Sequence, residues 1–137
     1  MRALRSILIR KIVITVLFIC IPLIFFSSSL LESFGIQVGT SLLIFRLLGV
    51  AYLALCIGYF GGIKMIDCGR DASSIADMGI ASNGLAGFVF VYFGVIGSWD
   101  SWNQFAKIYM WLLTFGAFYI STNLIMVRKK YLNKIYE

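Results

Sequence analysis

The sequence predicts an all-α fold: an integral membrane four-helix bundle with both termini cytoplasmic. Hydrophobic residues make up 61% of the 137 residues and charged residues only 13%, with a mean hydropathy of +0.93. Soluble domains average about 45–50% apolar and about 25% charged residues, so a water-soluble globule is excluded. Four apolar stretches reach the roughly 20 residues that a helix needs to cross a bilayer. The length suits one membrane domain, residues 1–137.

The four stretches are expected to be helices, at about 12–31, 41–63, 75–97 and 105–127. Backbone groups in lipid must be paired within their own segment or in a closed barrel. The strands of a barrel would be about ten residues long with alternating polarity. No such alternation occurs in these stretches, which favours helices.

Two features mark the first stretch. Pro22 lies in its outer half and predicts a kink or a local loosening of the helix. The basic residues before it and the small residues Ser27–Ser29 near its end also resemble a secretory signal peptide. We expect the segment to be retained as a membrane helix, with cleavage as the alternative.

The basic residues set the orientation, because cytoplasmic loops are rich in Lys and Arg. The two loops on the other side carry Glu32 and Asp100 and no basic residue. The sequence therefore predicts a multi-pass protein of the cell (inner) membrane. Its basic termini are expected to attract anionic lipids, which accounts for their charge, so no nucleic-acid partner is expected. Ten of the twelve basic residues fall on the predicted cytoplasmic side: Arg2, Arg5, Arg10, Lys11, Lys64, Arg70, Arg128, Lys129, Lys130 and Lys134.

Three polar residues within the spans are candidates for a function. Arg46 lies about one turn inside the second span, where its side chain is expected to reach the interface or to pair with Glu32 or Asp100. The alternative is a site for an anionic headgroup or substrate. Asn83 and Asn123 are expected to hydrogen-bond to each other or to a neighbouring helix. The alternative for both is a polar lining for a small permeant.

Small residues predict where helices approach closely in lipid. Ala54, Gly58 and Gly62 are four residues apart and share one face of the second helix. We expect this ridge to face a neighbouring helix, within the bundle or across an oligomer. Gly87 and Gly94 give the third helix similar packing positions.

The sequence offers no catalytic, cofactor or metal site. It contains no histidine, which removes the most common general acid–base and a frequent metal ligand. The acids of the second loop repeat no recognised ligand spacing, and the three cysteines form no CxxC pattern. Ser74 and Asp77 instead fit a capping box at the start of the third helix.

These observations favour a non-catalytic accessory or scaffold subunit that packs against the helices of partner proteins. The alternative is a small oligomeric transporter or channel for an anion or a small polar solute, with Arg46, Asn83 and Asn123 along its path. A third hypothesis is an enzyme acting on a lipid or a quinone. We expect no enzymatic activity and no bound cofactor, and either other membrane subunits or a homo-oligomer as partners.

Overall fold

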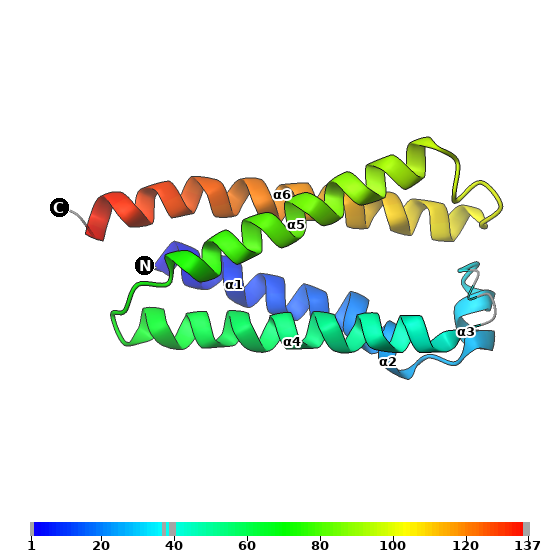
Figure 1. Ribbon diagram of the computed structural model, residues 1–137, viewed down its shortest axis with the longest axis horizontal. Helices are drawn as coiled ribbons and strands as arrows, with labels where there is room; N and C mark the ends of the chain where they lie inside the picture. Colours follow the sequence, from blue (N-terminus) through cyan, green and yellow to red (C-terminus); the bar gives the residue numbers. More distant parts are fainter. Residues whose placement is uncertain (1, 37, 39–40, 136–137) are drawn as a thin grey trace.

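The computed structural model describes residues 2–36, 38 and 41–135, with side chains up to Lys130 (Figure 1). Lys134, one of the basic residues used for the orientation, therefore lies outside the described side chains. Every regular element of the described residues is helical. The elements are α1 (Arg2–Thr15), the π-helical turn η1 (Val16–Cys20), α2 (Ile21–Phe25), α3 (Ser28–Ser33), α4 (Leu42–Asp67), α5 (Ser73–Val95) and α6 (Gln104–Ile135).

Four helical stretches in the described part of the chain are long and apolar enough to cross a membrane. They cover Arg2–Phe25, Leu42–Asp67, Ser73–Val95 and Gln104–Lys130. The all-helical class and four helices long and apolar enough to cross a membrane are therefore confirmed, but the first of these helical stretches is shifted. It starts at Arg2 instead of near residue 12, because Leu4 and Leu8 are fully buried and extend the packed face of α1. It ends at Phe25 instead of near residue 31, because the backbone turns extended at Phe26.

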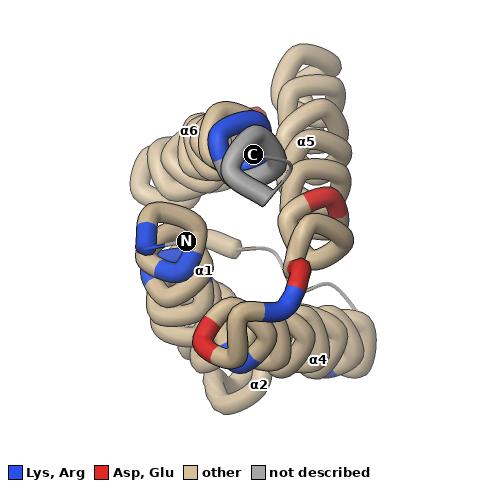
Figure 2. The backbone as a smooth tube through the Cα atoms, turned by 90° about the vertical axis from the view of Figure 1, so that its left-hand side faces the viewer, with Lys and Arg blue, Asp and Glu red and all other residues tan. Residues whose placement is uncertain are grey.

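The four long helices surround a common interior in the order α1, α6, α5 and α4 (Figure 2). α1 begins, α4 ends, α5 begins and α6 ends on the same side of the molecule, which we call the basic end (Figure 1). A cluster of buried residues including Leu4, Leu8, Tyr59, Ile63 and Leu124 fills the interior there. The hydrophobic core is therefore concentrated at the basic end.

α4 and α5 meet near the basic end and then diverge (Figure 1). A Cβ added at Gly62 would lie 2.6 Å from Ile75 Cγ2 of α5. At Gly58 the nearest neighbour is Met78 Cε, at 3.4 Å, and Ala54 is exposed. Of the three ridge residues, Gly62 makes the expected close approach to a neighbouring helix, Gly58 makes an ordinary van der Waals contact, and Ala54 faces outward. An approach across an oligomer stays a prediction.

α5 and α6 pack closely along most of their length. Added Cβ atoms would lie 2.7 Å from Leu124 at Gly79, and 2.9 Å from Phe118 at Gly87. At Gly94 the corresponding distance, to the ring of Trp99, is also 2.9 Å. Aromatic rings thus fill the space that these last two glycines leave.

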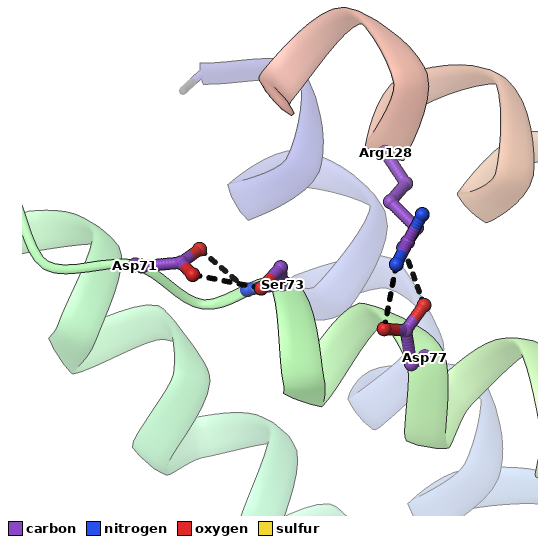
Figure 3. A network of polar contacts seen from close by, with 4 residues as sticks. All are labelled: Asp71, Ser73, Asp77 and Arg128. Atoms are coloured by element: carbon purple, nitrogen blue, oxygen red, sulfur yellow. Dashed lines mark hydrogen bonds and ion pairs between the residues drawn. The ribbon is translucent and has the colours of Figure 1, made fainter. Parts of the chain in front are cut away.

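At the basic end, polar contacts hold the start of α5 to the preceding loop and to α6 (Figure 3). The Asp71 carboxylate accepts hydrogen bonds from the Ser73 backbone N–H (2.9 Å) and hydroxyl (2.8 Å). The Asp77 carboxylate makes an ion pair with Arg128 of α6. The predicted capping box is therefore wrong, because α5 already begins at Ser73 and Asp77 binds the neighbouring helix instead of its own N-terminus.

Candidate functional site

The side chain of Lys11 lies inside the bundle. It is only 6% exposed, and its Nζ donates a hydrogen bond to Asn83 Oδ1 of α5 at 2.6 Å. The same Nζ lies 4.9 Å from the centre of the Tyr59 ring of α4, within the range of a cation–π contact. Six residues separate it from Arg5, so it lies about 9 Å further along the helix axis. A cation is thus held between three helices.

The charge of Lys11 has no acidic counterpart among the described residues. The ion pairs found there join Arg5 to Asp67 and Arg128 to Asp77, both with half-exposed aspartate side chains. An amide oxygen and an aromatic ring stabilise an ammonium group, but neither neutralises it. At the centre of a membrane helix a charged side chain costs about 3 kcal/mol on insertion scales, and a buried charge without a partner is costly for the same physical reason. Lys11 is therefore a buried cation whose charge is not neutralised by any described carboxylate.

Lys11 borders a central cavity of about 260 Å³. This volume is close to the lower limit of about 300 Å³ for small-molecule sites. All four long helices contribute to its walls. The residues lining it include Thr15 and Ile19 of the first span, Leu48 and Tyr52 of α4, Ser82, Asn83 and Phe90 of α5, and Leu112 and Ala117 of α6.

The cavity has a polar end and an apolar end. Lys11, Ser82 and Asn83 lie at the end nearer to the basic end of the bundle. In the opposite direction the walls are mostly apolar, with Thr15 and Tyr52 as polar residues among them, and reach Ile19 and Phe90. Eight residues separate Lys11 from Ile19, which corresponds to about 12 Å along the helix axis. The cavity thus changes from charged to apolar toward the middle of the bundle.

A second hollow of about 200 Å³ lies between α1 and α6 and adjoins the first. Lys11, Ile14, Gly116 and Ile120 line both hollows. We call this second hollow the α1–α6 groove; its other lining residues are Ile7, Arg10, Tyr119 and Asn123.

The α1–α6 groove connects the site to the outer surface of the bundle. Tyr119 is 65% exposed and Ile14 is 44% exposed. A Cβ added at Gly116 would meet no atom within 4 Å, so the groove is unfilled at this position. Lys11 can therefore be approached from the side of the bundle, between α1 and α6.

Arg46 has a local role at the break after α2. Its guanidinium donates hydrogen bonds to the backbone oxygens of Leu23 (2.9 Å) and Phe26 (2.7 Å). The chain turns extended at Phe26, so the carbonyl groups at the end of α2 lack the N–H partners that a continued helix would provide. Arg46 thus has backbone partners in place of the expected ion pair with Glu32 or Asp100.

The turn η1 precedes Pro22 and shows how the first span is loosened. Pro22 has no N–H, so it cannot bond to the backbone oxygen of Phe18 as an α-helix requires. Tyr109 of α6 donates its hydroxyl hydrogen bond to that oxygen. The expected loosening is therefore present as a π-helical turn, held by a side chain from another helix.

Asn83 and Asn123 have different hydrogen-bond partners and line different hollows. Asn83 is buried; its oxygen accepts from Lys11, and its amide group donates to the backbone oxygen of Gly79. Asn123 donates to the backbone oxygen of Tyr119 in its own helix, at 2.7 Å, and lines the α1–α6 groove. The structure therefore brings Asn83 to the cavity and Asn123 to the groove, with no hydrogen bond between them.

The sequence reasoning missed Lys11, because it counted this residue among the basic residues that flank the first span. Leu4, Leu8, Lys11 and Thr15 follow the spacing of a single helix face, and all four are buried. This spacing was visible in the sequence once the helix was allowed to begin before residue 12. Comparison with protein families, curated proteins and solved structures finds no match to this chain.

Proposed function

We propose that this chain is a small multi-pass membrane protein that binds an anion at Lys11 and carries it across the bilayer. The observation that supports this function best is the burial of Lys11 against Asn83 and Tyr59 with no described carboxylate within ion-pair distance. An anion in the adjoining cavity would supply the missing charge. This function corresponds to the transporter alternative, with Lys11 in place of Arg46 as the binding cation.

The proposal is binding and transport without catalysis. The chain has no histidine, and the described cavity walls carry no acid. A proton transfer near neutral pH would therefore depend on groups poorly suited to it.

The experiment is the uptake of labelled anions into liposomes that contain the purified protein. Chloride, methanesulfonate and octanesulfonate are suitable, because sulfonates stay charged and do not cross the bilayer as neutral acids. Charge-assisted hydrogen bonds contribute about 1.5–3 kcal/mol, so Lys11→Met should lower uptake about tenfold or more, whereas Lys11→Arg should keep a large part of it. Equal uptake by wild type and Lys11→Met, or no protein-dependent uptake of any of these anions, would contradict the proposal.

We further propose that the basic end faces the cytoplasm, as the distribution of Lys and Arg favours. Cys68 is exposed in the connection between α4 and α5, whereas Cys20 and Cys56 are buried. A membrane-impermeant maleimide should therefore label Cys68 only after the cells are permeabilised. Rapid labelling of Cys68 in intact cells would reverse the orientation.

A second candidate function is the accessory subunit, which the exposed part of the Ala54–Gly58 ridge favours. α5 turns away from this part of α4, so a helix of a partner protein has room to approach it. Extraction from native membranes with a mild detergent tests this function. It predicts a partner chain in constant ratio, and recovery of the single chain alone would contradict it.

A further inference from the structure

The polarity and the side access of the Lys11 site together indicate the chemical class of its ligand. We infer that the ligand is a single-chain amphiphile with an anionic head, which enters from the bilayer through the α1–α6 groove. This inference rests on the proposed anion binding at Lys11 and adds the substrate class and the route.

The first step of the argument is the direction of the polarity. The charged end of the cavity is nearer to the basic end of the bundle, and the apolar walls extend toward Ile19 and Phe90 at the middle. An amphiphile in the membrane leaflet at the basic end has the same orientation, with its head outward and its chain toward the bilayer centre. It can therefore move sideways into the cavity without turning over. A small hydrophilic ion would leave the apolar walls without a ligand.

The second step is the size of the site. A cavity of about 260 Å³ is small for a ligand site and extends about 12 Å beyond Lys11. It suits one hydrocarbon chain better than the two chains of a phospholipid. Lys11 supplies three N–H donors, of which one is used by Asn83. The remaining donors suit the oxygens of one anionic head, such as a carboxylate or a sulfonate.

The third step is the route. The α1–α6 groove shares Lys11, Ile14, Gly116 and Ile120 with the cavity, and Gly116 leaves space that any larger side chain would fill. Arg10 also lines the groove and is exposed, so a second cation lies along the approach of an anionic head. The groove thus offers access from the lipid side at the depth of Lys11.

The test is photolabelling of the protein in liposomes with a fatty acid of about ten carbons, whose extended length matches the roughly 12 Å of the cavity, with a diazirine near the end of its chain. We expect labelled peptides from the apolar cavity walls around Ile19 and Phe90, and competition by unlabelled decanesulfonate but not by methanesulfonate. Gly116→Leu should reduce this labelling about tenfold by filling the groove. Gly61→Leu is the matched control, because a Cβ at Gly61 also meets no atom within 4 Å but lies outside both hollows. Its labelling should equal that of the wild type.

Two outcomes would overturn the inference. One is labelling confined to the outer surface of the helices; the other is equal labelling of the cavity walls in the wild type and in a folded Gly116→Leu variant. If Gly116→Leu fails to fold, Lys11→Met and the decanesulfonate competition decide, and the absence of both effects overturns the inference. Chloride or methanesulfonate uptake that depends on Lys11, without labelling of the cavity, would refute the amphiphile and leave the proposed function standing. The absence of any uptake would refute the proposed function itself.

Discussion

The basic end of the bundle and its opposite half are held together in different ways. At the basic end, helices approach through small residues, as where Gly62 meets Ile75 and Gly79 meets Leu124, and ion pairs close the surface. In the opposite half the first span contains a π-helical turn and ends at Phe25, and Arg46 and Tyr109 donate hydrogen bonds to its backbone oxygens. The close contact of α4 with α5 is at Gly62, and the cavity that Lys11 borders lies between the four helices. Both halves therefore depend on packing, since Gly87 and Gly94 of α5 also meet aromatic rings, and the opposite half adds hydrogen bonds from side chains to the backbone of the first span.

The largest effect on stability is expected at Arg46. Arg46→Met removes two charge-assisted hydrogen bonds and leaves the oxygens of Leu23 and Phe26 without this donor, which should lower the free energy of unfolding by about 3 kcal/mol. Arg46→Lys should be intermediate, because an ammonium group cannot span both oxygens as the planar guanidinium does. Unfolding in detergent micelles measures the effect. The exposed neighbour Leu47 gives the control variant Leu47→Ala, and equal unfolding of Arg46→Met and this control would refute the role of Arg46.

A smaller effect is expected from an adjacent pair of glycines in α4. A Cβ at Gly62 would lie 2.6 Å from Ile75 Cγ2 and 3.1 Å from its Cβ, and this branched side chain is stiff. Gly62→Ala should therefore cost about 1–3 kcal/mol of stability through overpacking. Gly61→Ala should be neutral or stabilise by up to about 1 kcal/mol, because its Cβ meets open space and alanine favours the helix. The same unfolding assay compares the two, and a Gly62→Ala variant as stable as Gly61→Ala would contradict packing as the basis of the basic end.

The smallest effect is expected at the π-helical turn. Tyr109→Phe removes the hydrogen bond to the backbone oxygen of Phe18, and such bonds between membrane helices contribute about 0.6 kcal/mol on average. Pro22→Ala restores an N–H that can bond to the same oxygen. In that background, Tyr109→Phe should have little further effect on unfolding. A double-mutant cycle measures this coupling, and strictly additive effects would show that the two residues act independently.

The contrast between the two halves also explains what the sequence could predict. Hydropathy over about 20 residues revealed all four spans, because that signal depends on composition and not on contacts. The partners of Arg46 could not be predicted, since they depend on where the first span breaks and on which helix passes the break. Lys11 was assigned to the flank of its span, because charge patterning counts basic residues without regard to the helix face on which they lie. Its spacing from Leu4, Leu8 and Thr15 indicates that it lies on the buried face of α1.

The glycine pattern was informative only in part for a similar reason. A ridge of small residues such as Ala54, Gly58 and Gly62 indicates that a close approach is possible, but the crossing angle of the two helices decides how far it extends. The connection at residues 68–72 brings Gly62 next to Ile75, and the divergence of α4 and α5 then leaves Ala54 exposed. Sequence spacing contains no information on this divergence.

The charge at Lys11 is the centre of the proposed function, and anomalous diffraction tests it most directly. Crystals soaked in sodium bromide should show a bromide ion in the cavity in contact with Lys11 Nζ, on the side away from Asn83. Crystals of Lys11→Met, treated in the same way, should lack this peak. A wild-type cavity that stays empty after soaks with sodium bromide and with decanesulfonate, or a carboxylate of the protein itself bound to Lys11, would contradict anion binding at this site.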